Sequence, residues 1–177
     1  MTFTQVYELD DFDPSGFDGR WGMVLDESTV WDEATQEWVP ELLKGQELNI
    51  RHEGDLQIYR IRVDIGDDLS VHMAYECTFG AARWVPYRLV QVDGDPNDPR
   101  LGPNATLKQG MRLGEPIAWI KQVYVDPRTQ YRITRNPDGT AQYVMMRRLN
   151  EAGTRNVGTV LSADGVANVD KAFMRLD

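Results

Sequence analysis

Residues 69–79 read LSVHMAYECTF, and their apolar side chains fall on every second position. Because residues two apart share one face of a β-strand, this alternation predicts a strand that buries one face and exposes the other. Tyr75 belongs to the apolar face, which we expect to point inward. Glu76 belongs to the opposite face and would reach the interior only if a β-bulge intervened.

The same alternation recurs along most of the chain, whereas helical periodicity is nearly absent. Helical turns are expected only at residues 41–45 and, more briefly, at residues 12–17. Tight turns rich in Gly, Asp, Asn and Pro separate the strands, as in an up-and-down meander. The predicted strands are Arg20–Leu25, Glu47–His52, Leu56–Ile65, Leu69–Phe79, Arg83–Val92, Pro116–Val125, Gln130–Arg135, Ala141–Leu149, Val157–Leu161 and Val169–Leu176.

These strands predict an all-β fold, a single antiparallel up-and-down β-barrel with an internal pocket. Closure into a barrel pairs both edge strands, which favours a barrel over an open sheet. The 177 residues fit one domain, 1–177, with the barrel at about residues 17–176. One connection is long, at residues 93–115. A loop of that length in a compact domain is often a lid over a functional site.

Charge and composition exclude several classes of function. The formal net charge is −9, so most of the surface should repel phosphate backbones, and we expect no nucleic-acid partner. No apolar run approaches the roughly 18 residues that cross a bilayer. Because Met1–Phe17 also lacks the pattern of a signal peptide, we expect a cytoplasmic protein without a membrane partner. The single Cys77, only two histidines and the lack of phosphate-binding motifs predict no disulfide, no metal and no cofactor.

Residues near the two ends of the chain resemble a known superfamily. Phe17-Asp18-Gly19-Arg20-Trp21 matches the Phe-x-Gly-x-Trp start of the first strand in lipocalins, and Arg175 stands in the last predicted strand. The chain therefore resembles the lipocalin-like (calycin) barrels, without the signal peptide and disulfide of the secreted members. The resemblance implies that the late arginine packs across the tryptophan and closes the base of the barrel. It implies a pocket but no particular function.

Strand parity selects the side chains that should line this pocket. Both faces of the sixth predicted strand are apolar, so either Trp119 with Lys121 or Ile120 with Tyr124 could point inward. A buried arginine needs an anion or several acceptors, so a ligand with a carboxylate and a hydroxylated or aromatic body would suit the pocket. Besides the apolar face of residues 69–79, the inward set is Leu48, Ile50, His52, Tyr59, Ile61, Val63, Val85, Tyr87, Leu89, Tyr131, Ile133, Ala141, Tyr143, Met145 and Arg147.

The residue types of the pocket also resemble those of phenolic acid decarboxylases, lipocalin-like barrels that use tyrosines, an arginine and a glutamate without a cofactor. This likeness implies a cofactor-independent lyase or isomerase that acts by acid–base chemistry on a small aromatic or hydroxylated acid. The candidate catalytic residues are Tyr75, Tyr143, Arg147 and Glu76, and the candidate substrate-binding residues are Tyr59, Tyr87, Tyr131, His52, His72 and Trp119.

Other interpretations of the same residues stay open. A calycin barrel is most commonly a non-catalytic carrier or sensor of a hydrophobic small molecule. A protein–protein module would use Trp31 and Trp38 instead, and the sequence leaves open whether two barrels associate as a homodimer. The tyrosines could be plain core residues, and His72 and Glu76 could lie on a solvated outer face.

Overall fold

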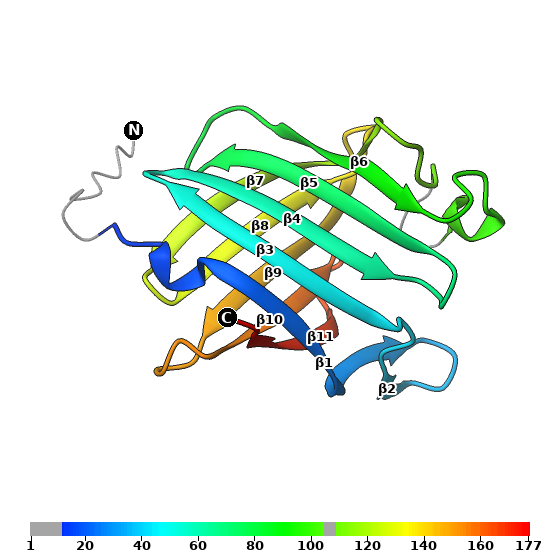
Figure 1. Ribbon diagram of the computed structural model, residues 1–177, viewed down its shortest axis with the longest axis horizontal. Coiled ribbons are helices and arrows are strands. Elements are labelled where there is room, and N and C mark those ends of the chain that lie inside the picture. The colour runs from blue at the N-terminus through cyan, green and yellow to red at the C-terminus, as the bar shows by residue number, and fades with distance from the viewer. Residues whose placement is uncertain (1–11, 105–108) are drawn as a thin grey trace.

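Eleven strands and two short 3₁₀ helices form the computed structural model, which describes residues 12–104 and 109–177 (Figure 1). No helix within these ranges is long and apolar enough to cross a membrane. The elements are η2 (Ser15–Phe17), β1 (Gly19–Asp32), β2 (Glu37–Pro40), β3 (Gly45–Glu53), β4 (Leu56–Asp64), β5 (Ser70–Thr78), β6 (Val85–Asp93), η3 (Pro99–Leu101), β7 (Pro116–Asp126), β8 (Thr129–Arg135), β9 (Ala141–Leu149), β10 (Arg155–Ser162) and β11 (Ala167–Arg175).

The strands close into a barrel. From β3 to β11 each strand pairs antiparallel with the next, and β1 completes the ring by pairing with both β3 and β11. In the described part of the chain, ten strands therefore form the wall, and β2 lies outside it, paired only with the far half of β1. The predicted all-β, up-and-down antiparallel barrel is confirmed.

The hairpin of β1 and β2 is the main element that the sequence pattern missed. β1 continues well beyond Leu25 to Asp32, and residues 33–36 turn the chain back into β2. This turn contains neither Gly nor Pro, and Gln36 adopts the positive φ of 57° that such residues usually supply. The helical turn expected at residues 41–45 is wrong, because the chain there enters β3 directly. The short turn expected at residues 12–17 is present as η2.

Trp21 and Arg175 close one end of the barrel. They are direct partners across the β1–β11 pairing, and the Arg175 guanidinium carbon lies 4.2 Å from the centre of the Trp21 ring. The indole Nε1 donates to the carbonyl of Phe17 at 2.9 Å, and Arg175 donates to the carbonyls of Gly16, Asp18 and Gly153. Trp21 is fully buried. The arrangement implied by the lipocalin resemblance is therefore confirmed.

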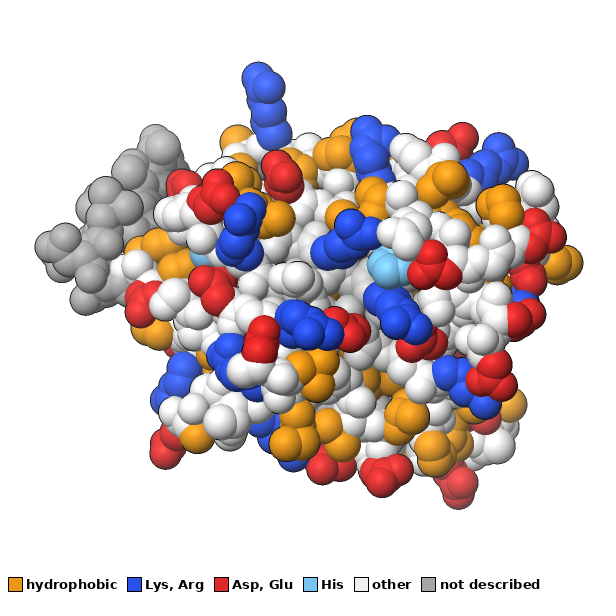
Figure 2. All heavy atoms as spheres, in the orientation of Figure 1, with side chains coloured by type: hydrophobic (Ala, Val, Ile, Leu, Met, Phe, Trp, Pro, Cys, Tyr) orange, Lys and Arg blue, Asp and Glu red, His pale blue; other side chains and the backbone are white. Residues whose placement is uncertain are grey.

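Strands β3 to β6 follow the expected parity. Tyr59, Tyr75 and Tyr87 are buried in the barrel, whereas Arg60 and Arg62 are exposed and bond to Gln91 and Asp64. Figure 2 shows this outer face, where Lys and Arg side chains lie among Asp and Glu side chains. The front of the barrel is therefore a conventional sheet with an apolar interior and a charged exterior.

Strand β8 reverses that pattern. Its buried side chains are polar, and they include Arg132, which lines the interior. Tyr131 and Ile133 alternate with these residues and lie on the outer face, so their predicted inward positions are wrong. The open choice on β7 is settled in favour of Ile120 and Tyr124, which are buried, and Trp119 lies outside. A polar interior at this wall inverts the rule that the apolar side of a strand faces inward.

Candidate functional site

A cavity of about 460 Å³ occupies the barrel. Its wall includes side chains from β3 to β11, and it extends to the turns at residues 136–141 and 162–167, at the end opposite Trp21. This volume falls in the range of about 300–1,000 Å³ that is usual for small-molecule sites. The main lining side chains are Leu48, Tyr59, Ile61, Met73, Tyr87, Ile117, Arg132, Tyr143, Met145, Arg147, Val160, Lys171 and Phe173.

Arg132 stands among four tyrosines. Its guanidinium carbon lies between 5.2 and 5.9 Å from the ring centres of Tyr59, Tyr75, Tyr87 and Tyr143, which is cation–π distance. Its Nη2 donates to the Tyr143 hydroxyl at 2.8 Å. Its Nε and Nη1 are buried and have no hydrogen-bond partner among the described residues. The aromatic rings therefore stabilise the charge, but two of the three guanidinium nitrogens are left without an acceptor.

Arg147 is the second buried cation of the cavity. Its Nη1 donates to Asn156 Oδ1 at 2.8 Å, and its guanidinium lies 5.3 Å from the ring centre of Phe173. Burial lowers the pKa of this guanidinium, and the like charge of Arg132 lowers it further. The prediction that Arg147 points into the barrel is therefore confirmed.

The lining contains no acidic side chain to balance these charges. Among the described residues that line the cavity there is no Asp or Glu. The third cation of the lining, Lys171, is already paired, since its Nζ lies 2.7 Å from Glu41 Oε2. The two arginines therefore give the cavity an uncompensated positive charge.

The tyrosines form a stacked group beside Arg132. Tyr59 and Tyr75 stack with their ring centres 4.6 Å apart, and Tyr87 meets both edge to face. Burial raises the pKa of Tyr75 and of Tyr87, so both phenols stay protonated at neutral pH. A protonated phenol donates a hydrogen bond but does not act as a base.

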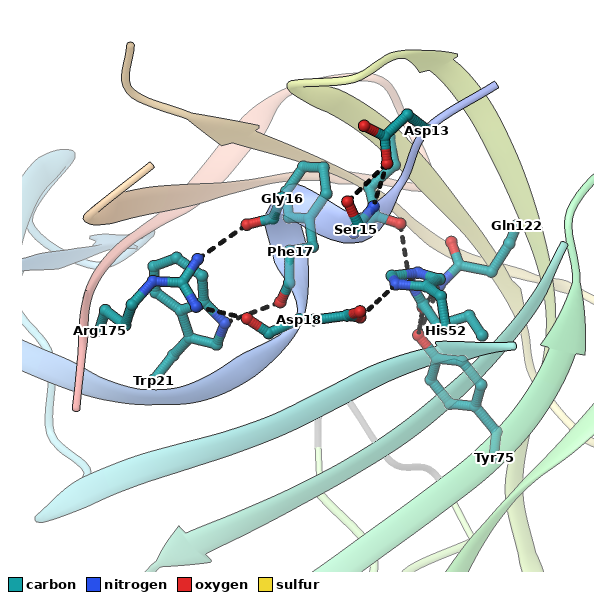
Figure 3. Close-up of polar contacts among 12 residues, drawn as sticks. Asp13, Ser15, Gly16, Phe17, Asp18, Trp21, His52, Tyr75, Gln122 and Arg175 are labelled. Carbon is teal, nitrogen blue, oxygen red and sulfur yellow. Dashed lines mark hydrogen bonds and ion pairs between the residues drawn. The ribbon is translucent and has the colours of Figure 1, made fainter. Parts of the chain in front are cut away.

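Beneath the cavity, a polar network links the tyrosines to the closed end of the barrel (Figure 3). The Tyr75 hydroxyl donates to Gln57 Oε1 at 2.8 Å, and Gln122 Nε2 donates to the same hydroxyl at 2.5 Å. Gln57 Nε2 lies 3.0 Å from His52 Nε2, and His52 Nδ1 lies 2.7 Å from Asp18 Oδ1. Because an amide nitrogen only donates, the His52 ring is neutral, with its proton on Nδ1 toward Asp18.

This network makes a pH-dependent contribution to stability. Burial lowers the pKa of His52, although the nearby carboxylates of Asp18 and Asp13 oppose the shift. As pH falls below about 6.5, the unfolded chain therefore takes up a proton that the folded chain resists, so the free energy of unfolding decreases. Urea unfolding between pH 7 and pH 5 should show a steeper loss for the wild type than for His52→Gln. Parallel curves for the two proteins would contradict the prediction.

Comparisons with known proteins add a fold but no family. No protein-family model matches the chain, and no curated protein sequence matches it. Among solved structures, the crystal structure of a point mutant of the fluorescent protein UnaG matches with a TM-score of 0.53 at 14% sequence identity. The match covers 92% of this chain and 98% of that chain. The fold is a calycin-like barrel. At this identity the likeness shows the fold alone.

The calycin-like barrel brings together part of the predicted site. Tyr59, Tyr87, Tyr143 and Arg147 line the cavity, and Tyr75 stacks on Tyr59 with its hydroxyl turned toward the closed end. His52 belongs to the polar network and does not line the cavity. His52 stands near the end of β3, which lies at the closed end of the barrel beside Asp18.

Four other candidates lie outside the barrel. Glu76 is exposed, because the β4–β5 pairing runs in regular register past it and no bulge turns it inward. His72 lies on the same outer face and pairs with Asp93 at 2.8 Å. Trp119 and Tyr131 alternate with inward neighbours on β7 and β8. No combination of these four side chains can meet a molecule inside the cavity.

The loop at residues 93–115 does not line the cavity in the part that the structure describes. Leu101 in η3 is buried, and Arg100 fixes this segment by pairing with Asp68 and Asp98. Residues 105–108 lie outside the described residues. The lid that the loop length suggested therefore has no support from the residues that are described.

Sequence reasoning missed Arg132 and the buried glutamines. Arg132, Gln57, Gln122 and Gln130 all point inward from strands whose apolar residues were assigned to the interior or left open. One signal was available, because the predicted strand at residues 130–135 alternates Gln, Arg and Thr with larger apolar residues. A strand with one polar and one apolar face fits a polar interior as well as an apolar one.

Proposed function

We propose that this barrel binds a small anionic molecule with an apolar or aromatic body and carries or senses it without chemical change. The observation that carries the proposal is the pair of buried arginines, Arg132 and Arg147, that line the cavity with no carboxylate beside them among the described residues. A calycin-like barrel with an internal cavity is a common architecture for small-molecule binding.

The cost of burying these cations supports an anionic ligand. An unpaired charge in a low-dielectric interior destabilises a protein by several kcal/mol, and so it is normally paired. A ligand carboxylate could accept from Arg132 Nη1 or from Arg132 Nε, the two buried nitrogens without partners. Hydrogen bonds between charged groups are about twice as strong as neutral ones, which would anchor the acidic end of the ligand.

The remainder of the lining suits an uncharged body. Ile61, Ile117, Val160 and Phe173 present apolar surface, and the faces of Tyr59 and Tyr87 offer aromatic contact. Burial of apolar area contributes roughly 25 cal/mol per Å², so a body that fills the cavity adds several kcal/mol to binding. The ligand class is thus an organic acid of small to medium size.

A lyase receives less support than a binding protein. Proton transfer needs a base within about 3 Å of the reacting atom. No Asp, Glu or His lines the cavity among the described residues, and the phenols of Tyr75 and Tyr87 are held protonated. Glu76, the glutamate proposed for this role, is exposed on the outer face. The cavity offers donors and a positive field, which bind an acid, but no evident base.

Calorimetric titration with a matched pair of probes tests the proposal. Decanoate and decanol share the apolar chain and differ in the charge of the head. We expect decanoate to bind at least about tenfold more tightly, because only the carboxylate meets the buried guanidiniums. Equal affinity for the two would overturn the proposal. Recovery of each probe with its mass unchanged after prolonged incubation would support binding, and conversion of a bound acid would indicate an enzyme.

A further inference from the structure

The two buried arginines lie side by side. The Nη2 atoms of Arg132 and Arg147 lie 3.9 and 3.5 Å from the same Met145 sulfur. The two side chains come from neighbouring strands, since Arg132 pairs with Met145 and Arg147 pairs with Gln130 across β8 and β9. A single head group on a ligand could therefore contact both guanidiniums at once.

The charges around this pair do not cancel. The groups that face the pair are the hydroxyl and rings of the four tyrosines, the Asn156 amide, the Met145 sulfur and the Phe173 ring, all of them uncharged. Lys171 has its own partner in Glu41 and does not enter the balance. The described lining thus holds two positive charges in excess. A ligand with one negative charge would neutralise only one of them and leave the other buried.

We infer that the ligand carries two negative charges on one compact head, as a geminal dicarboxylate or a phosphate monoester does, attached to an apolar body. This inference rests on the proposed function and narrows its ligand class. A compact head is required because the two guanidiniums flank one methionine, so charges at the two ends of a long diacid could not both reach them.

The place of the arginines along the barrel also gives the ligand an orientation. β9 runs from the turn at residues 136–141 toward the end closed by Trp21 and Arg175, and Arg147 lies near the end of that path. Tyr143, which hydrogen-bonds Arg132, lies nearer to the turn. The acidic head therefore enters first, and the apolar body extends toward the turns at residues 136–141 and 162–167.

Three probes with the same alkyl chain test the inference by calorimetric titration at pH 8, where a phosphate monoester is doubly charged. Decanoate carries one charge, octylmalonate is decanoate with a second carboxylate on the same carbon, and octyl phosphate carries both charges on one phosphorus. We expect at least one of the two dianions to bind at least tenfold more tightly than decanoate. The tighter of the two identifies the head as dicarboxylate or phosphate.

Variants show whether the preference comes from the paired arginines. In Arg147→Met the ratio of the dissociation constants of decanoate and the better dianion should fall toward one. In Arg148→Met, which changes the adjacent exposed arginine, the ratio should stay at the wild-type value. Circular dichroism and thermal unfolding of each variant establish that the barrel is folded before binding is compared.

The outcomes separate this inference from the proposed function. If decanoate binds more tightly than decanol but as tightly as both dianions, the dianionic head is wrong and anion binding stands. If neither decanoate nor the dianions bind better than decanol, both proposals are wrong. A dianion preference that survives in Arg147→Met would also overturn the inference, because it would then arise elsewhere on the protein.

Discussion

The Arg132→Met variant should be more stable than the wild type in the absence of ligand and should lose most of its affinity for decanoate. Replacement of a buried charge by an apolar side chain of similar volume is often stabilising, by about 1–4 kcal/mol. Arg132 is buried, has two nitrogen donors without partners and contacts no carboxylate among the described residues. Removal of a charged partner from a buried contact costs about 2 kcal/mol or more in binding, roughly 30-fold in affinity.

The measurements for Arg132→Met are thermal unfolding of the ligand-free protein and titration with decanoate. In a domain of this size, 1 kcal/mol corresponds to about 2–4 °C in the unfolding midpoint. Arg148→Met, on the outer face, should change stability by no more than about 0.5 kcal/mol and leave binding intact. A loss of stability in Arg132→Met would show that the tyrosine contacts make Arg132 structural. Opposite signs for stability and binding are typical of a residue kept for function.

Trp21→Ala should destabilise the barrel by about 3–5 kcal/mol, the range typical of removing a buried tryptophan. The side chain is fully buried, its Nε1 bonds to the Phe17 carbonyl, and its ring carries the Arg175 guanidinium. Removal of the indole leaves a cavity, and it also removes the ring on which the Arg175 guanidinium stacks. Urea unfolding measures the loss. Trp38→Ala, where 42% of the residue is exposed, is the control with a small expected effect. A loss below about 1 kcal/mol for Trp21→Ala would mean that the closed end can repack.

The front of the barrel could be predicted from the sequence because its physics is simple. Strands β3 to β5 have an apolar and a charged face, and water is on the charged side, so period-two parity places Tyr59 and Tyr75 inside. The contact of Trp21 with Arg175 followed from a family resemblance and not from periodicity. Such a pairing joins residues far apart in the chain, and no local pattern specifies it.

The back of the barrel, formed by β7 and β8, could not be predicted by the same rule. Arg132 lies inward, although charged side chains usually face water, and Tyr131 lies on the outer face, although aromatic side chains are usually buried. Parity states which residues share a face but not which face is inside, and the choice was made from hydrophobicity alone. The choice fails on β8, because the buried side chains of that strand are polar. Gln122 was overlooked because both faces of its strand are apolar, whereas Gln57 shares the inward face of Tyr59 and follows from parity.

The β1–β11 seam has a consequence for how the protein is made. The first wall strand cannot complete its pairing until β11 has been synthesised, about 150 residues later, so the barrel cannot close before β11 has emerged from the ribosome. Until then β3 to β6 can pair as hairpins, and their apolar faces around Tyr59 and Tyr75 stay exposed to water. Newly made chains are therefore most vulnerable to aggregation in the interval before Arg175 reaches Trp21.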